Sequence, residues 1–269
     1  MTTRRTFLAS AAFASVAPYA HGAKVPFVLG VASYSLRKKS RAEAIAAMRK
    51  LDVHHASVKE FHLRYTSTPE EIAAAKQEFA AAKIKVASGG NISLSGDDAT
   101  LRKMFEYAKA AGMPMIVCAP THATVAKVEA LVKEFDIRAA IHNHGPEDKH
   151  FPTPQSVLDA VKNMDARMGL CIDIGHTART GADVVESIVT AGKANRLFDL
   201  HVKDLTDFKG KSSQVAVGEG KMPMKQIFQA LKKLNFKGGA MLEYEINADD
   251  PLPGMEKSFA HMRQVLATV

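Results

Sequence analysis

The sequence has little cysteine and, after its N-terminal segment, no long apolar run. Only two cysteines, Cys118 and Cys171, occur among 269 residues. Each lies in a short apolar stretch, which is typical of a buried thiol. Apolar residues make up 46 % of the chain, enough for one substantial core without a disulfide. Without a further apolar run of about 18 residues, stable membrane insertion of the mature chain is not expected.

The sequence also lacks a concentrated basic pattern. The formal net charge is +8, but lysine and arginine are dispersed, and one of the densest clusters is RKKSR at 37–41. No basic stripe alternates with aromatic residues, so nucleic acid is not expected as a partner. A mild positive charge suits an anionic or a polar small molecule equally well.

The N-terminal segment resembles a twin-arginine export signal. The sequence RRTFL at 4–8 precedes a short Ala- and Ser-rich apolar run that ends at small residues near 22–23. A membrane anchor is the alternative, but this run is too short and too weakly apolar to span a bilayer comfortably. We therefore expect residues 1–23 to be a signal peptide, residues 24–269 to form one mature domain, and the protein to be periplasmic or otherwise exported.

Short β-like runs alternate with helical stretches throughout residues 24–269. The expected strands are 27–35, 55–63, 84–90, 113–120, 137–145, 167–176, 196–204 and 238–245. The expected helices are 40–51, 68–83, 97–112, 122–135, 154–164, 180–193, 222–234 and 255–268. This alternation predicts an α/β protein with a closed (β/α)8 TIM barrel. An open doubly wound sheet is the alternative, but the Gly-rich phosphate motif that follows its first strand is missing.

Side-chain parity along the last four expected strands brings ligand-type residues to one place. Alternate residues of a barrel strand face the helices and the interior. The residues expected to face the helices include Ile141, Leu170, Ile172, Phe198, Leu200 and Leu242. This leaves His142 (or His144), Asp173, His201 and Glu243 facing inward near the C-terminal strand ends, where barrel active sites form.

Two imidazoles and two carboxylates suit one divalent metal ion. Mn²⁺, Co²⁺, Zn²⁺ or Fe²⁺ is favoured over Mg²⁺ because of the nitrogen ligands. The alternative is structural polar packing without an ion. Four uncompensated polar groups in one barrel mouth would then carry a large desolvation cost, which favours the metal.

With these residues, the chain resembles the xylose-isomerase-like TIM barrel superfamily. The matching motifs are DIGHT at 173–177, HVKD at 201–204 and LEYE at 242–245. Members of the superfamily include sugar isomerases, ketose 3-epimerases, inosose dehydratases and endonucleases. The resemblance covers most of the mature chain and supports the barrel.

The resemblance also implies roles for individual residues. By motif, Asp173, His201 and Glu243 match metal ligands, and His176 matches a residue near the substrate oxygens. Many relatives have a glutamate where this chain has His142, and they use it as one of two proton-transfer carboxylates. That departure favours elimination chemistry more than the family's commoner activities would.

Several further residues are weaker candidates. Lys203, two residues beyond His201, is expected to act as a base or to hold an oxyanion, or else to pair with its neighbour Asp204. From the second expected strand, Lys59 and His62 are candidates for substrate binding, with surface exposure as the alternative. His144 is expected to contact the substrate if His142 binds the metal.

The predicted function is that of a divalent-metal-dependent sugar isomerase or epimerase that works through a metal-stabilised enolate. Glu243, Lys203 and His176 are the candidates for proton transfer. One alternative is a metal-dependent lyase or dehydratase that carries out β-elimination on a keto-sugar or a 3-keto-glycoside. Another is a sugar-binding protein without catalysis. An endonuclease is less expected, since no basic groove is evident.

Overall fold

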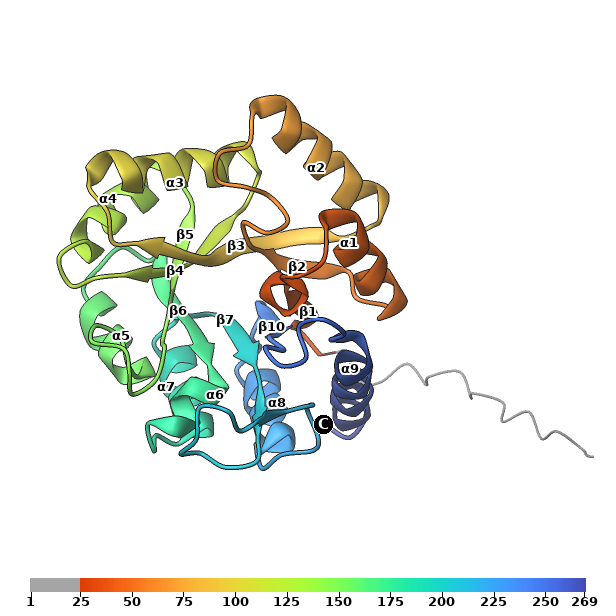
Figure 1. Ribbon diagram of the computed structural model, residues 1–269. Coiled ribbons are helices and arrows are strands. Elements are labelled where there is room, and N and C mark those ends of the chain that lie inside the picture. Colours follow the sequence, from red (N-terminus) through yellow and green to blue (C-terminus); the bar gives the residue numbers. More distant parts are fainter. Residues whose placement is uncertain (1–24) are drawn as a thin grey trace, which may run out of the picture.

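A computed structural model describes residues 25–269, and the expected export signal at 1–23 lies outside them. Eight parallel strands close into a barrel in the order β1-β10-β7-β6-β5-β4-β3-β2 (Figure 1). They are β1 Val28–Ala32, β2 His55–Val58, β3 Lys85–Leu94, β4 Met115–Pro120, β5 Arg138–His142, β6 Met168–Asp173, β7 Leu197–Val202 and β10 Gly239–Leu242. The predicted TIM barrel is confirmed.

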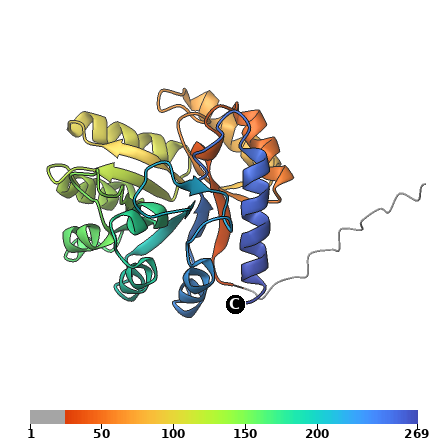
Figure 2. The same ribbon diagram turned by 60° about the horizontal axis from the view of Figure 1, so that its bottom comes forward.

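Helices surround the strands (Figure 2). They are α1 Arg41–Lys50, α2 Pro69–Ala81, α3 Asp98–Ala110, α4 Val125–Phe135, α5 Pro154–Val161, α6 Ile174–Arg179, α7 Val184–Lys193, α8 Met224–Lys233 and α9 Leu252–Leu266, with the 3-10 helix η1 Ser33–Leu36. The helix starts follow local sequence: Thr68 and Glu71 form a capping box around α2, whose first residue is Pro69. None of the helices in residues 25–269 is long and apolar enough to cross a membrane.

Within residues 25–269, the first and last elements meet at the barrel seam. Helix α9 lies beside α1, and the Arg263 guanidinium donates to the carbonyl of Leu51 over 2.7 Å. Inside the ring of helices, β1 pairs with β10 in parallel register from Val28 opposite Gly239. The barrel is therefore closed by both backbone pairing and helix packing.

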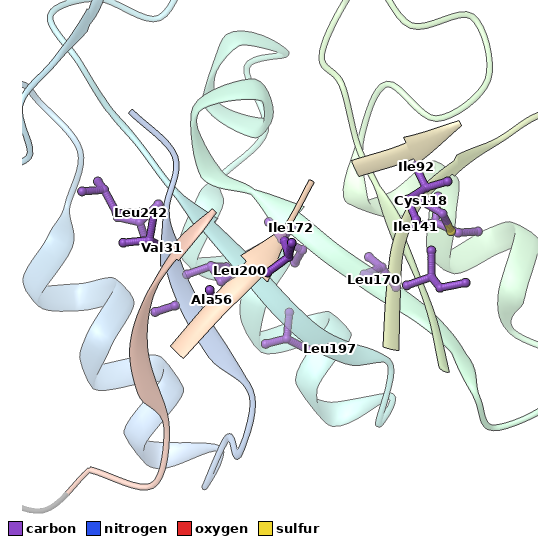
Figure 3. Packing of buried hydrophobic residues seen from close by; sticks show 14 of the residues in the cluster. Val31, Ala56, Ile92, Cys118, Ile141, Leu170, Ile172, Leu197, Leu200 and Leu242 are labelled. Atoms are coloured by element: carbon purple, nitrogen blue, oxygen red, sulfur yellow. The ribbon is translucent and has the colours of Figure 1, made fainter. Parts of the chain in front are cut away.

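The larger hydrophobic layer lies between strands and helices, as parity predicts. Figure 3 shows part of it, including Ile141, Leu170 and Leu200. A smaller cluster contains Met115, Val117, Ala140, Cys171 and Phe198. Phe198 was expected in the helix-facing layer, but it belongs to this smaller cluster, so that prediction is wrong. Leu170 pairs with Leu197, but the next residue, Cys171, pairs with Asp199. Phe198 is therefore an extra residue in β7, a bulge that breaks the alternation of side chains.

Other boundaries differ from expectation in ways that matter for the site. Strand β2 ends at Val58, so Lys59 and His62 lie in the following loop. After β7, two short strands, β8 Asp204–Leu205 and β9 Gln214–Val215, form an antiparallel hairpin. Strands of two residues are too short for alternation to reveal them.

Candidate metal centre and substrate pocket

Four of the predicted residues converge at the C-terminal mouth of the barrel. His142 ends β5, Asp173 ends β6, His201 lies in β7 and Glu243 directly follows β10. All four side chains are buried, and each offers a ligand atom within 4.8 Å of the others. The convergence follows from register, since Asp173 pairs with His201 and His201 pairs with Met241, two residues before Glu243.

The spacing of these atoms fits a single divalent ion. His142 Nε2 lies 3.0 Å from His201 Nδ1 and 3.4 Å from Asp173 Oδ2. Glu243 Oε2 lies 3.1 Å from His201 Nδ1 and 4.0 Å from His142 Nε2. Ligand atoms about 2.0–2.2 Å from one ion are roughly 2.8–3.6 Å apart in tetrahedral or octahedral arrangements. The cluster could therefore hold a metal ion with little movement.

His142 and Asp173 already have the protonation state of a metal ligand. Burial lowers the pKa of His142 to about 3, so its imidazole is neutral at ordinary pH and retains a lone pair. Burial by itself raises the pKa of Asp173. The Lys203 ammonium, with His176 and His142 beside the carboxylate, outweighs that effect and holds the pKa well below its usual range, so the carboxylate is ionised.

His201 differs in its protonation state. Burial lowers the pKa of His201, but its contacts with Cys171 and Glu243 raise that pKa well above its usual value. This ring must therefore release a proton when an ion binds.

Neighbouring motif residues fix the orientation of Asp173. Its Oδ1 accepts from the backbone N–H of His176 over 2.8 Å at the start of α6, which leaves Oδ2 free to face the cluster. Its own N–H donates to Asn143 Oδ1, and Asn143 donates to the Thr177 hydroxyl. Asn143, which lies between His142 and His144, and Thr177 of the DIGHT motif therefore anchor one carboxylate.

Two side chains hold the segment that carries Glu243. The Ser35 hydroxyl donates to the carbonyl of Leu242 and accepts from the N–H of Tyr244. From β9, Gln214 Nε2 donates to the Glu243 carbonyl over 2.6 Å, and Gln214 Oε1 accepts from the N–H of Glu245. The unpredicted hairpin therefore helps to position both glutamates of LEYE.

Lys203 reaches the same carboxylates. Its Nζ lies 2.9 Å from Asp173 Oδ2, 3.0 Å from Glu243 Oε2 and 3.0 Å from Glu245 Oε2. Although burial lowers the pKa of Lys203, these three carboxylates raise it well above its usual value, so the group is an ammonium. Gly175 leaves room for it, because an added Cβ there would lie 3.1 Å from the Cβ of Lys203.

The alternative ion pair between Lys203 and Asp204 is not formed. The Asp204 carboxylate instead accepts from the backbone N–H groups of Gly218, Gly220 and Met222 over 2.8–3.1 Å. The loop of residues 218–220, Gly-Glu-Gly, is thus held by the Asp204 carboxylate. Asp204 lies on the far side of the backbone from Lys203, as strand alternation requires.

A pocket of about 200 Å³ opens above the cluster. The residues that line it are Tyr34, Lys59, Asn91, His142, His144, His176, Glu243 and Glu245. The predicted residues Lys59 and His144 therefore reach the pocket. His176 also lines it, from the short helix α6 rather than from the expected loop.

His62 does not line this pocket and corrects the prediction of a substrate contact. Its ring is buried, with Nε2 3.2 Å from the carbonyl of Leu36 and Nδ1 3.0 Å from the Ser33 hydroxyl. Since a carbonyl only accepts, Nε2 carries the proton and Nδ1 accepts from Ser33. The same hydroxyl accepts from the N–H of Lys59. His62 thus supports the pocket wall from behind.

Sequence reasoning missed Asn91 and gave no role to Gln214. The side-chain Nδ2 of Asn91 lies 2.8 Å from His144 Nε2. The backbone carbonyl of Asn91 accepts a hydrogen bond from Lys59 Nζ. Strand β3 was expected to end at Gly90, but it continues to Leu94 through a bulge between Gly89 and Ile92. A Gly-Gly pair inside a strand pattern is itself a bulge signal, and it could have drawn attention to Asn91.

A larger cleft of about 900 Å³ lies outside the barrel mouth, between α6, α7 and the start of α8. Its lining is mainly apolar and includes Val184 and Phe208. We assign the chemistry to the smaller pocket because the ionised and ligand-type groups converge there.

The comparisons with known proteins agree with this architecture. The sequence profile described as xylose isomerase-like TIM barrel matches residues 42–265. No curated protein matches the chain. Among solved structures, an uncharacterised protein of Parabacteroides distasonis ATCC 8503 is 24 % identical, with a TM-score of 0.69 over 89 % of this chain and 99 % of its own.

Two further structures carry functional names. An L-ribulose 3-epimerase is 15 % identical, with a TM-score of 0.73 over 90 % of this chain and 95 % of its own. The "probable 3-DHS dehydratase AsbF" of Bacillus anthracis is 15 % identical, with a TM-score of 0.66 over 87 % of this chain and 98 % of its own. At these identities the likeness extends to the fold alone.

Proposed function

Because the chain belongs to the xylose isomerase-like TIM barrel family, we propose that it is a divalent-metal-dependent enzyme that isomerises or epimerises a small sugar. The observation that carries this proposal is the convergence of His142, Asp173, His201 and Glu243 beneath a polar pocket. A volume of about 200 Å³ lies below the range of drug-sized sites and suits a monosaccharide.

The chain's own residues divide the work. His142, Asp173, His201 and Glu243 would hold the ion, which when bound supplies Lewis-acid polarisation of a carbonyl. Lys59 and His144 also line the pocket, where they would orient sugar hydroxyls.

Epimerisation needs proton-transfer groups on both faces of the sugar, whereas isomerisation can use one. The Glu243 carboxylate would accept the proton next to the carbonyl, and the Lys203 ammonium beside it would stabilise negative charge on the substrate oxygen. His176, which also lines the pocket, would return the proton. Isomerisation or epimerisation then depends on which carbon receives it.

Elimination is the second candidate, and His142 is the observation that favours it. With this imidazole among the ligands, the strand β5 position offers no carboxylate to deliver a proton from the opposite face. Loss of a β-substituent from a keto-sugar or a 3-keto-glycoside needs only one base and a leaving group. A sugar-binding protein without turnover is the remaining alternative.

The test is incubation of metal-loaded protein in heavy water with ketohexoses, ketopentoses and 3-keto-glycosides. Deuterium next to the carbonyl in recovered sugar, together with a new isomer, is the expected result. An unsaturated ultraviolet-absorbing product would instead assign the protein to the lyases. If neither product forms and no proton exchanges with any of several divalent metals, binding without catalysis becomes the better description.

Export of the folded enzyme by the twin-arginine route is also part of the proposal. It is supported by RRTFL at 4–8. Replacing both arginines by lysine should retain the protein in the cytoplasm on cell fractionation. Unchanged export of that variant would remove this element.

A further inference from the structure

Lys203 and the two candidate imidazole ligands face the same two carboxylate oxygen atoms. Asp173 Oδ2 lies 2.9 Å from Lys203 Nζ and 3.4 Å from His142 Nε2. Glu243 Oε2 lies 3.0 Å from the same ammonium and 3.1 Å from His201 Nδ1. The ammonium and a metal ion would therefore be bound through shared carboxylate oxygens.

The charge of the region indicates how such sharing is resolved. Asp173, Glu243 and Glu245 together carry three negative charges, and Lys203 carries one positive charge. With both imidazoles neutral, as metal ligands must be, a divalent ion would bring the total charge of this region to zero. The third carboxylate is not one of the four clustered ligands, and its only ion pair in the described residues is with Lys203, at 3.0 Å.

We propose that Lys203 is a built-in competitor of the metal ion, and that Glu245 is the partner that draws its ammonium away when the ion binds. Lys203 occupies both ligand oxygens in the absence of metal, which reduces the repulsion between two buried carboxylates. When the ion takes those oxygens, the ammonium keeps Glu245 as its remaining partner. Glu245 lies at the pocket, with 40 % of its side chain exposed, so Lys203 is then directed towards the substrate.

The positions of both residues support this exchange. Lys203 lies two residues after His201, so its stem starts on the ligand side of the barrel. Gly175 lies close against that stem. A Cβ atom added to Gly175 would lie 3.1 Å from the Cβ and 3.2 Å from the Cδ of Lys203. The stem is therefore confined, and the ammonium can move only locally among its three carboxylates. The backbone of Glu245 is held by Gln214, which keeps the third carboxylate within reach.

The inference rests on the metal site of the proposed function, so the experiment first measures whether that site exists. Protein stripped with a chelator is titrated with Mn²⁺ and with Co²⁺ by competition with a chromophoric chelator. Wild-type protein should bind one equivalent. If it binds none, the proposed metal centre is wrong and the competition with it.

Given wild-type binding, four variants test the competition. Lys203→Met should bind Mn²⁺ about tenfold more tightly or better, because a like charge is removed from the ligand oxygens. Lys203→Arg, which keeps the charge, should stay close to wild type. Glu245→Gln should bind about 3–10-fold more weakly, because the ammonium loses its alternative partner. The double variant Lys203→Met with Glu245→Gln should match Lys203→Met alone.

Lys225→Met, at an exposed site on α8, is the matched control and should leave affinity unchanged. Far-ultraviolet circular dichroism and a thermal melt confirm that each variant is folded. Glu245 is partly exposed, so its variant remains informative if Lys203→Met does not fold. Unchanged or weaker binding by folded Lys203→Met, or unchanged binding by Glu245→Gln, would overturn the proposal while leaving the metal site in place.

Discussion

His142 and His144 are two positions apart in the sequence, but their surroundings indicate different roles. His142 is 3 % exposed and its Nε2 faces the candidate ligands, whereas the side chain of His144 is 34 % exposed and bonds to Asn91. His142→Ala should weaken Mn²⁺ binding by more than about 100-fold, since loss of an outer-shell partner alone commonly gives 10–100-fold. His144→Ala should keep Mn²⁺ affinity within about threefold of wild type and raise KM for the sugar. Equal losses of metal affinity would mean that both imidazoles are ligands.

The anchoring of Asp173 leads to a second prediction at this scale. Asn143→Ala removes the acceptor for the Asp173 N–H and the donor to Thr177 without touching the ligand atoms. We expect Mn²⁺ affinity to fall about 10–100-fold, as for other outer-shell partners, with the ligand count unchanged. Competition with a chromophoric chelator measures the change. The exposed Asn163→Ala is the control, and wild-type affinity in Asn143→Ala would contradict the anchoring role.

At the scale of elements, strands with regular side-chain alternation could be predicted from the sequence, whereas bulges and the short hairpin could not. The four candidate ligands were found because β5, β6, β7 and β10 alternate regularly near their C-terminal ends. Phe198 and Asn91 were misjudged or missed because bulges break the period of two at those points. The hairpin of β8 and β9 is defined by pairing across a loop, which no local pattern reports. Lys203 was recognised, but its three partners come from two other segments.

The contact between η1 and the loop after β2 gives a pH prediction. Burial lowers the pKa of His62 below its ordinary value of 6.5, so the folded chain keeps this ring neutral. Between the folded-state pKa and pH 6.5, the His62 ring is protonated in the unfolded chain and neutral in the folded chain, so a fall in pH favours unfolding. The stability that His62 contributes is therefore complete above pH 6.5 and is lost as pH falls through the folded-state pKa.

His62→Gln tests this, because an amide can keep the bonds to Leu36 and Ser33 but does not titrate. Urea unfolding in the presence of chelator, between pH 8 and pH 5, should give a shallower decline in unfolding free energy for the variant than for wild type. The chelator removes any contribution from pH-dependent metal binding. Parallel declines would show that His62 does not titrate on unfolding. The exposed His54→Gln is the control.

For the whole molecule, one ion would connect four strands that are neighbours around the barrel, β5, β6, β7 and β10. Ligands from separate segments do not assemble in the unfolded chain, so metal affinity is also folding free energy. At a free metal concentration of about 100 times Kd, stabilisation is about 2.7 kcal/mol. For a domain of this size, that raises Tm by about 5–10 °C.

Addition of Mn²⁺ to the stripped protein should give this shift in a thermal melt, and excess chelator should reverse it. Asp173→Asn keeps the shape of the side chain but removes its charge, so it should lose most of the shift, whereas the exposed Asp159→Asn should keep it. An equal Tm with and without metal in the wild type would mean that the four side chains pack as a polar core and hold no ion.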